Sequence, residues 1–485
     1  MNVQPAGQVR RQLIGKGLRE EQLLDSAGDL DTYDHDGFGG SRHRPGLVVL
    51  CESASDVVAS VRACKASFVP WVARGAGTGL SGGATPPDGG VVIALAGCRD
   101  VGEVAPADGL ATLGPGVTNL EISSLVGVEG LFYAPDPSSQ VVCTIGGNVA
   151  ENSGGAHCLK YGFTTHHVLG VEIVTPEGDL VALGGDVPDV PGYDLRGVFV
   201  GSEGTLGAAV RITVRVVPRP QAVRTVLVDF PSVTAAGSAV AGIVGAQIVP
   251  ACLEMMDQLA MQACEAATGA GLPLDAAAVL IIECDGHPVC VEEDVAAIEV
   301  ICREAGARSF RLAADAAERA TIWRARKAAF AAMGRLAPDY IVQDGVVPRG
   351  ALPTVLARIE QLAAGTGLRV ANVFHAGDGN LHPLVLFDAA EPGASEDAEA
   401  LAETILTCCL ELGGSITGEH GVGVDKACMM PLMFSEDDLT IMDRVRRAFD
   451  PTGLCNPDKV LPTPRLCGES PGPYRRHPIE RAGLA

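Results

Sequence analysis

Up to about residue 220, the hydrophobic and polar positions along the chain follow a single pattern. Short apolar runs are bounded there by glycine and proline, a pattern typical of buried strands. This pattern predicts strands at 47–50, 68–73, 91–95, 168–175, 180–183 and 209–217. Helical spacing is predicted over 9–24, after the capping residue Ser53, and over 119–126. The prolines at 218 and 220 mark the predicted end of this region.

From residue 222 onward, strand and helix patterns alternate. The pattern predicts strands at 224–230, 248–254, 278–284 and 307–312, with helices at 233–245 and 291–305. The order β-α-β, β-α-β indicates an antiparallel sheet with two helices on one side, a ferredoxin-like layout. Further helices are predicted at 313–335, 352–363, 394–412 and 436–449, with strands at 369–375 and 382–387. The proline- and charge-rich tail beyond 462 is expected to be loose.

The stretch 134–162 has almost no large apolar side chain and cannot form a core by itself. Two glycine pairs, 146–147 and 154–155, frame Asn148 and Asn152, after a stiff Pro-Asp-Pro-Ser segment. Glycine permits positive φ and removes the Cβ from the approach path, so backbone N–H groups can come close to a phosphorylated ligand. A plain loop is the alternative, but the two framed pairs favour a cofactor cradle.

A second glycine-rich loop, 74–83, matches the dinucleotide pattern G-x-G-x-x-G at Gly77, Gly79 and Gly82. That pattern must open a helix, and here two prolines follow it, so we reject a Rossmann site. The next strand also begins too soon for a crossover helix. The loop therefore lies between strands, where its N–H groups and Arg74 could bind a pyrophosphate.

Composition narrows the function. A chain of 485 residues predicts two or three domains, and its net charge of −23 argues against a nucleic-acid partner. The N-terminus shows no signal core, and the most apolar window, 237–256, contains Gln247 and Pro250, so no membrane span is predicted. The 15 cysteines show no C-x-x-C and no cluster-binding spacing, which indicates reduced core thiols in a cytoplasmic protein. If the protein moves electrons, it must pass them to another molecule.

Two glycine-framed loops in the second half carry candidate chemistry. One places His375 and His382 on either side of a tight turn between predicted strands, and the other contains Glu419 and His420. Two His and one Glu form a ligand set suited to Zn²⁺ or a similar ion with open positions. The alternative is that these are turn histidines bonded to backbone. Arg326, on a predicted helix, is a natural clamp for a substrate carboxylate, although a solvated helix face would also explain it.

Together these motifs resemble the vanillyl-alcohol-oxidase/PCMH flavoprotein superfamily. Within it, the chain is similar to the FAD-binding D subunits of bacterial glycolate oxidase (glycolate dehydrogenase) and to D-lactate dehydrogenases. The motifs that carry the resemblance are 72–83, 134–140, 146–155, 201–207, 375–382, 418–421 and 456–459. They span nearly the whole chain.

The resemblance implies an α+β fold with a PCMH-type FAD-binding domain of two α/β subdomains, a ferredoxin-like antiparallel-sheet cap and a C-terminal helical segment. The implied segments are a helical lead-in (1–42), the FAD-binding domain (43–220), the cap (221–430) and a segment returning to the flavin domain (431–485). It further implies FAD, held without a covalent bond because the first loop lacks a tethering His or Cys. The implied FAD-binding residues are Arg74, Gly75, Gly77, Thr78, Gly79, Ser81, Pro135, Asp136, Ser138, Thr144, Gly146, Gly147, Asn148, Asn152, Gly154, Gly155 and Glu203.

The implied reaction is oxidation of glycolate to glyoxylate, or of D-lactate to pyruvate, by hydride transfer to flavin N5. The resemblance assigns the base to His420, the carboxylate binder to Arg326, and a divalent metal site to His375, His382 and Glu419. Relatives that oxidise D-2-hydroxyglutarate have a Lys and an Asn where Val342 and Leu384 stand here, which argues for a small monocarboxylate.

The implied partners are an iron–sulfur subunit and a second flavin-type subunit, through which the protein could reach the inner membrane. Two other functions stay open from the sequence. One is a flavin-binding scaffold without its own chemistry, and the other is a metal hydrolase built on the His and Glu set. D-lactate dehydrogenase as the main activity is a further alternative.

Overall fold

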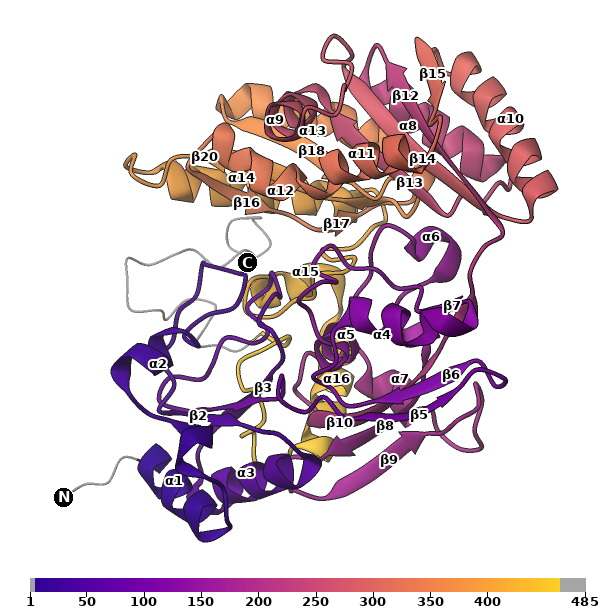
Figure 1. Cartoon of the computed structure of the whole chain (residues 1–485). Helices are drawn as coiled ribbons and strands as arrows, with labels where there is room; N and C mark the ends of the chain where they lie inside the picture. Colours follow the sequence, from indigo (N-terminus) through magenta and orange to yellow (C-terminus); the bar gives the residue numbers. More distant parts are fainter. Residues whose placement is uncertain (1–4, 463–485) are drawn as a thin grey trace. The chain divides into compact units, whose positions relative to one another are not determined.

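The computed structural model describes residues 5–462, so the predicted loose tail lies outside the described residues. Within this part the chain forms two units (Figure 1). Unit 1 comprises the chain up to Gly154, Gly162–Arg219 and the chain from Glu419 onward. Unit 2 comprises Pro220–Gly418 and the short segment Gly155–Tyr161, which leaves unit 1 and returns to it.

The first sheet of unit 1 has the order β1-β2-β4-β3. Its strands are β1 (Leu23–Leu24), β2 (Leu47–Leu50), β3 (Trp71–Arg74) and β4 (Val91–Ala94). β4 pairs in parallel with both β2 and β3. Because no helix forms between β3 and β4, the loop 75–90 alone makes the crossover, as the sequence predicts. Helices α1 (Pro5–Gly15) and α3 (Ala54–Ser67) complete the core of this sheet.

The first predicted helix was too long. The pattern over 9–24 predicts one helix, but α1 ends at Gly15, and a 3-10 turn at Glu20–Gln22 precedes β1. Gly17, with a φ of +94°, explains the break, because this conformation is left-handed and leaves the helix.

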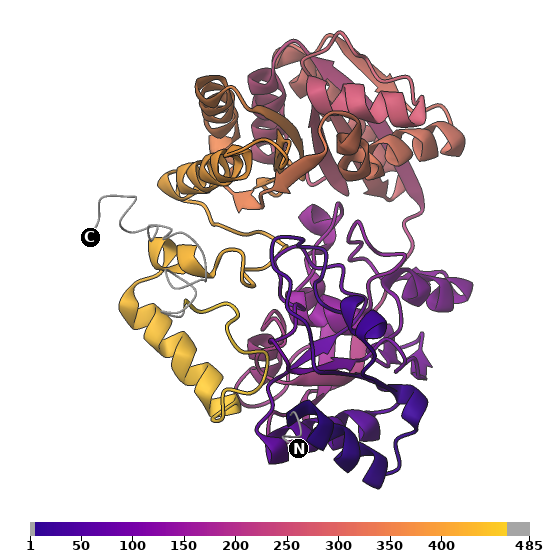
Figure 2. The ribbon, with the colours of Figure 1, turned by 90° about the vertical axis from the view of Figure 1, so that its left-hand side faces the viewer.

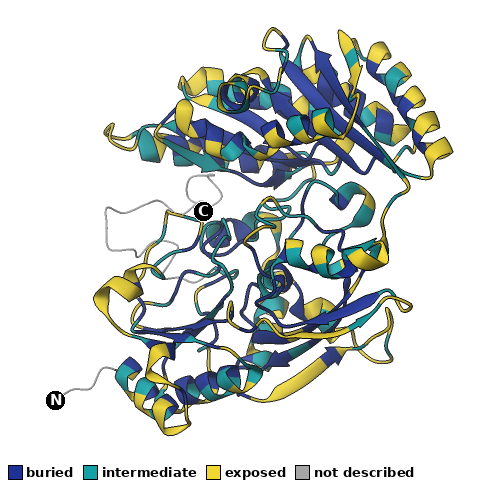
Figure 3. Ribbon diagram, in the orientation of Figure 1, coloured by how far each residue is buried: buried dark blue, intermediate teal, exposed yellow. Residues whose placement is uncertain are grey.

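The second sheet of unit 1 is antiparallel, with the order β5-β6-β10-β8-β9. Its strands are β5 (Val101–Ala105), β6 (Leu110–Leu113), β8 (Val168–Val174), β9 (Leu180–Gly184) and β10 (Ala208–Arg215). The edge strand β9 is mostly exposed (Figure 3). Helices α4 (Asn119–Val126), α5 (Ile145–Glu151) and α7 (Leu195–Phe199) pack on the sheet through a shared apolar core.

The C-terminal part of unit 1 contains α15 (Met430–Met433) and α16 (Glu436–Phe449), coloured yellow in Figure 2. Beyond α16 the chain runs beside β3. There the backbone N–H of Trp71 donates to the carbonyl oxygen of Leu454, and the backbone N–H of Asn456 donates to the carbonyl oxygen of Trp71. The Asn456 amide also donates to Gly83 O and Glu203 O, at 2.9 and 2.8 Å. The end of the described chain thus fastens the glycine loop that follows β3.

Unit 2 is built on a seven-stranded sheet with the order β15-β12-β14-β13-β18-β20-β16, in which each strand pairs antiparallel with its neighbours. Its strands are β12 (Ala222–Phe230), β13 (Cys252–Asp257), β14 (Ala278–Gly286), β15 (Ser309–Leu312), β16 (Asp339–Val342), β18 (Arg369–Phe374) and β20 (Pro383–Phe387). Its first four strands have the ferredoxin-like order that the sequence predicts. The other three extend the sheet beyond β13.

Helices cover both faces of this sheet. The two helices predicted for one side, 233–245 and 291–305, do lie on the same face, and the helices of the other face are additional. Residues of one strand point alternately to the two faces, so Leu253 and Met255 of β13 face one core and Met256 the other. The first core includes α8 (Val233–Gly245), α10 (Pro288–Glu304), α13 (Leu352–Thr366) and α14 (Ala394–Glu411). The second includes α9 (Gln258–Thr268), α11 (Ala316–Lys327) and α12 (Ala329–Ala332).

No helix in the described part of the chain is long and apolar enough to cross a membrane. The described cysteines carry free thiols, and all but Cys290 and Cys428 are buried.

Candidate active site

The histidine-bearing loop of unit 2 connects β18 to β20. His375 follows the last residue of β18, pairs with Asn380 in an isolated bridge, and the chain turns at Gly379, whose φ is +75°. His382 comes directly before β20. The turn brings the two imidazoles together, with ring centroids 5.3 Å apart and planes at 89°. Both side chains are buried.

A buried glutamate orients the first histidine. Glu254 Oε1 lies 2.7 Å from Nδ1 of His375, and Glu254 Oε2 accepts from Nε of Arg326 at 2.8 Å and forms an ion pair with Nη2 at 2.6 Å. Burial disfavours the carboxylate, yet the charges of His375 and Arg326 outweigh it and lower the pKa of Glu254. A carboxylate on Nδ1 favours the tautomer that places the lone pair on Nε2.

A second arrangement orients His382. Its Nδ1 lies 3.2 Å from the carbonyl oxygen of Gln343, and Oδ1 of Asp344 is 3.7 Å away. Asp344 is fully buried and accepts from the hydroxyl of Thr417 and, at 2.8 Å, from the backbone N–H of Gly418. The last residue of unit 2 is therefore held next to the histidine pair.

These contacts fit a metal site. A metal-binding histidine usually donates its other ring N–H to a carboxylate or a backbone carbonyl, which fixes the ring and its tautomer. Nδ1 of His375 faces the carboxylate of Glu254, and Nδ1 of His382 faces the carbonyl oxygen of Gln343. In both rings Nε2 is therefore the atom left to bind a metal. The two remaining predicted groups, Glu419 and His420, open the C-terminal part of unit 1, with Glu419 Oε1 3.7 Å from Nε2 of His420.

Glu419 lies against the second glycine pair. A Cβ on Gly154 would come within 2.7 Å of its Oε2 and 2.8 Å of the Phe163 ring, so a larger residue would require these side chains to move. Gly155, the first residue of the segment that joins unit 2, has a φ of +153°.

The first glycine loop packs against α5 and against its own arginine. A Cβ on Gly75 would lie 2.4 Å from the hydroxyl of Thr144, the residue that caps α5 through Gly147 N. Gly77 has a φ of +70°, and a Cβ there would lie 2.2 Å from the guanidinium of Arg74. This guanidinium donates to the carbonyl oxygen of His35 at 2.6 Å.

Several predicted cofactor residues already bond to the protein. The Asn148 amide accepts from Asn119 at 3.0 Å and donates to Ser153 at 3.3 Å, and Asn152 caps α5 in the left-handed region while accepting from Thr165 N. Glu203 accepts from the N–H groups of Val422 and Gly423 at 2.8 and 2.6 Å, at the turn after His420. Their side chains shape the loops around the predicted cradle.

Other predicted residues present open groups. The hydroxyl of Ser81 is buried without a hydrogen-bond partner among the described residues, and so is Oε2 of Glu151, a residue that the sequence did not single out. Buried polar groups are normally satisfied, so they point to a polar ligand beside the loop. Thr78, Gly79 and Asp136 are half-buried, Gly146 and Gly147 lie in the first turn of α5, Pro135 is buried and Ser138 is exposed. The unit 1 loops therefore fit a cofactor such as FAD.

Sequence reasoning missed Glu254 and Asp344. Glu254 stands inside the apolar run of β13, and such a lone carboxylate in a buried strand is a usable signal of a buried partner. Asp344 precedes a short strand and gave no comparable signal. The two residues expected to distinguish substrates, Val342 and Leu384, are direct partners across β16 and β20.

Comparison with known proteins identifies relatives over nearly the full length. Residues 45–184 match the family described as FAD binding domain, and residues 219–460 match FAD linked oxidases, C-terminal domain. Glycolate oxidase subunit GlcD of Escherichia coli K12 is 48% identical over 95% of this chain and 93% of its own length. GlcD of Bacillus subtilis is 38% identical over 93% and 96%, and D-lactate dehydrogenase of Anaerostipes hadrus is 30% identical over 93% and 94%.

Solved structures show the same fold. p-Cresol methylhydroxylase superposes with a TM-score of 0.78 at 15% identity, covering 94% of this chain and 96% of its own. 4-Ethylphenol oxidase of Gulosibacter chungangensis superposes with a TM-score of 0.77 at 16% identity, covering 95% and 98%. These neighbours confirm the predicted α+β PCMH-type fold class.

Proposed function

This chain belongs to the family of FAD-linked oxidases that includes the GlcD subunits of glycolate oxidase, and from this membership we propose that it oxidises a small 2-hydroxy acid with FAD. Glycolate is the expected substrate, since the most similar relatives named above are glycolate oxidase subunits. D-lactate is the second candidate, supported by the D-lactate dehydrogenase relative. The observation that carries the proposal is the buried group Arg326–Glu254–His375 beside His382, in a chain whose first half matches an FAD-binding family.

In this proposal FAD supplies the acceptor for the hydride of the substrate. Arg326 donates Nε–H to Glu254 and forms an ion pair with it through Nη2, so both N–H groups of Nη1 and the second N–H of Nη2 remain for the substrate carboxylate. A guanidinium already fixed by a buried carboxylate is held in place before the substrate arrives, which reduces the entropy cost of binding. His420 takes the hydroxyl proton on its imidazole, whose ordinary pKa of about 6.5 suits a general base.

We also propose a divalent metal on Nε2 of His375, Nε2 of His382 and the carboxylate of Glu419. Such an ion acts as a Lewis acid on a substrate oxygen. Chain connectivity supports including Glu419: Gly418 is anchored on Asp344 beside His382, and consecutive Cα atoms are only about 3.8 Å apart.

The decisive experiment is anaerobic flavin reduction by the FAD-loaded protein, with glycolate, D-lactate and L-lactate in turn. We expect rapid bleaching by glycolate, slower bleaching by D-lactate and none by L-lactate. His420→Ala should still bind FAD and lose bleaching. A protein that binds FAD but bleaches with none of the three acids would overturn the proposed activity and favour the scaffold role.

The electron route requires another molecule, since the sequence has no iron–sulfur spacing. The relatives' name, a subunit of glycolate oxidase, supports a multi-subunit assembly, and we propose a partner that carries an iron–sulfur cluster. Purification of the tagged chain from its own cells, followed by iron analysis, tests this. An iron-free single chain that turns over with a soluble acceptor would contradict it.

A further inference from the structure

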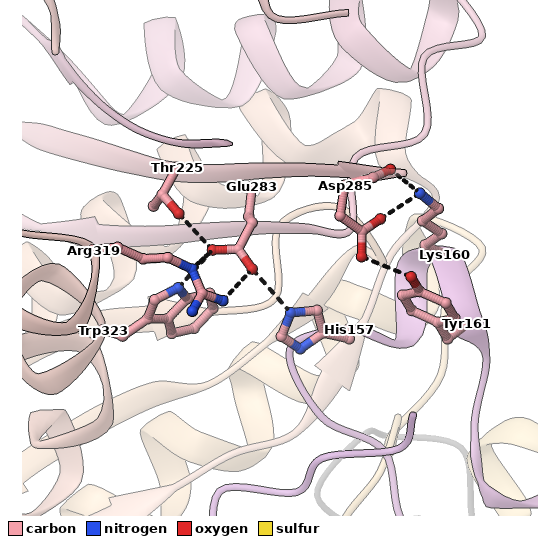
Figure 4. Close-up of polar contacts among 8 residues, drawn as sticks. All are labelled: His157, Lys160, Tyr161, Thr225, Glu283, Asp285, Arg319 and Trp323. Atoms are coloured by element: carbon pink, nitrogen blue, oxygen red, sulfur yellow. Dashed lines mark hydrogen bonds and ion pairs between the residues drawn. The ribbon is translucent and has the colours of Figure 1, made fainter. Parts of the chain in front are cut away.

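The segment Gly155–Tyr161 begins at the second glycine pair of unit 1 but packs in unit 2. Its last four residues form the short helix α6 (Cys158–Tyr161). It carries three polar side chains, of His157, Lys160 and Tyr161, toward two carboxylates of β14 (Figure 4). A seven-residue excursion of this kind would be free to move without such anchors.

The first anchor is Glu283, whose side chain is 2% exposed. It accepts two hydrogen bonds from Arg319 at 2.7 and 2.8 Å, one from Trp323 Nε1 at 2.9 Å and one from the Thr225 hydroxyl at 2.5 Å. His157 Nε2 lies 3.5 Å from the same carboxylate, and its ring stacks on Trp323 with centroids 5.8 Å apart. Glu283 is thus held in place by unit 2 and offers a fixed acceptor to the segment.

The second anchor is Asp285, two residues farther on the same face of β14. Tyr161 donates its hydroxyl to Asp285 Oδ2 at 2.6 Å, and Lys160 Nζ bonds to both the backbone oxygen and the carboxylate of Asp285. The Asp285 side chain is only 6% exposed. Figure 4 shows His157 on the Glu283 side and Lys160 and Tyr161 on the Asp285 side, so the segment is fastened at both ends.

Leu159 lies in the sequence between His157 and Lys160, and it contacts the histidine-bearing loop that connects β18 to β20. A Cβ on Gly377 would lie 2.5 Å from Cδ2 of Leu159 and 3.2 Å from Cβ of Leu253, so the backbone of Gly377 is enclosed by the two leucines. Gly377 N also donates to Leu253 O at 3.0 Å, one residue before Glu254. Gly377 is two residues from His375, so Leu159 covers the turn that sets this imidazole.

We propose that segment 155–161 is a latch that positions the histidine loop, with Leu159 as the positioning residue and Glu283 and Asp285 as its anchors. It would connect the glycine-rich flavin segment, from which it emerges, to the turn that carries His375. The proposal rests on the proposed function only in the claim that this turn serves catalysis. The order it imposes on the turn is independent of any substrate.

The test compares Leu159→Ala with Leu159→Met, which restores the volume, in the full-length FAD-loaded protein. Leu362→Ala is the matched control, because Leu362 is also a partly buried leucine on the same apolar core but lies on α13. Tyr161→Phe, which removes only the hydroxyl on Asp285, serves if Leu159→Ala does not fold. One readout is amide hydrogen exchange of peptide 375–382, and the other is the rate and half-saturation of flavin reduction by glycolate.

We expect Leu159→Ala to speed exchange across 375–382 about tenfold or more, since local opening then costs less. Its flavin reduction rate should fall about tenfold with little change in half-saturation, because the imidazoles are displaced rather than removed. Leu159→Met and Leu362→Ala should match the parent in both readouts. Tyr161→Phe should act in the same direction more weakly.

The latch is overturned if Leu159→Ala leaves amide exchange of peptide 375–382 unchanged. It is also overturned if Leu362→Ala accelerates this exchange equally. Faster exchange with an unaltered reduction rate overturns the positioning role and leaves only a packing role. A parent protein that reduces no flavin with any 2-hydroxy acid defeats the proposed function, whereas the exchange readout still decides whether the latch orders the turn. The two failures are therefore distinguishable.

Discussion

Arg326 and His375 bind opposite oxygens of a single buried carboxylate, that of Glu254. Nη2 of Arg326 lies 2.6 Å from Oε2, and Nδ1 of His375 lies 2.7 Å from Oε1. The arginine offsets the charge of the carboxylate, and the carboxylate fixes Nδ1 of the histidine as the donor, which leaves Nε2 for a ligand. The residue expected to clamp the substrate and one expected to bind a metal are thus oriented by the same group.

Glu254→Gln should therefore weaken metal binding and catalysis together. An amide can accept from only one of the two neighbours and turns its NH₂ toward the other, so the histidine or the arginine loses its orientation. We expect metal affinity and flavin reduction to fall about 10- to 100-fold. Metal titration and stopped-flow reduction measure these effects, with the exposed Glu360→Gln as control. Unchanged metal affinity in Glu254→Gln would refute the orienting role.

Two neighbouring glycines of the first loop should respond differently to alanine. In Gly77→Ala the new Cβ meets the Arg74 guanidinium and the backbone is left-handed, so we expect the FAD-free protein to lose about 2 kcal/mol of stability or more. In Gly79→Ala the nearest atom to the new Cβ is Asp36 Oδ2 at 3.6 Å, which is an ordinary van der Waals contact. The stability of the FAD-free protein should therefore be unchanged. Both should weaken FAD binding, because both approach the cofactor in the proposal.

Thermal unfolding of the FAD-free variants and fluorescence titration with FAD measure the two effects. An equal loss of stability in both variants would show that the loop geometry is not the reason for glycine at 77. Gly79→Ala with parental FAD affinity would remove Gly79 from the cofactor cradle.

The sequence was informative where one periodicity dominated. The spacing of apolar positions predicts the first four strands of unit 2, helices α8 and α10 and the ferredoxin-like order, although β13 lies at Cys252–Asp257 and not at 248–254. Helix α9 was missed because its pattern begins at Gln258, directly after the buried strand β13, with only Asp257 as its cap. The seventh, edge strand β16 is short and half-buried, which leaves little period to detect.

The candidate site was predictable in its residues but not in its connections. His375 and His382 could be paired because a tight turn separates them, whereas Glu254 lies 121 residues from His375 and reaches it only through the pairing of β13 with β18. Helix α5 was hidden by its glycines, since a helix of low propensity depends on the Thr144 cap and on packing. Contacts of this range depend on the register of strands, which one sequence does not display.

The latch predicts a pH-dependent stability in unit 2. Burial raises the pKa of Glu283, but hydrogen bonds from His157 and Arg319 outweigh it and hold the pKa well below its ordinary value. A carboxylate whose pKa is lower in the folded than in the unfolded state stabilises above the unfolded pKa of about 4.3, and this stability is lost as the pH falls below it. Glu283→Gln should cost about 1–2 kcal/mol at pH 7, because its donors lose an ionised acceptor while the half-exposed Arg319 can be solvated.

Urea unfolding of the parent and of Glu283→Gln at pH 7, 5.5 and 4 measures this difference, which should shrink toward the lowest pH. The exposed Glu293→Gln on α10 is the control and should follow the parent throughout. A difference that stays constant or grows on acidification would mean that the charge of Glu283 does not stabilise the fold.

Substrate size should respond to Val342, which pairs with Leu384 across β16 and β20. Leu384 is fully buried in the core beside α11 and is best left intact, whereas Val342 is half-buried and can accommodate a longer side chain. A second substrate carboxylate needs a cation, so Val342→Lys should raise kcat/KM for D-2-hydroxyglutarate relative to glycolate about tenfold. Steady-state assays with both acids measure this ratio, and Val342→Met controls for side-chain length. If Val342→Met changes this kcat/KM ratio as much as Val342→Lys does, the charge at position 342 is not the cause, because a neutral side chain cannot attract a carboxylate. The second carboxylate would then bind elsewhere.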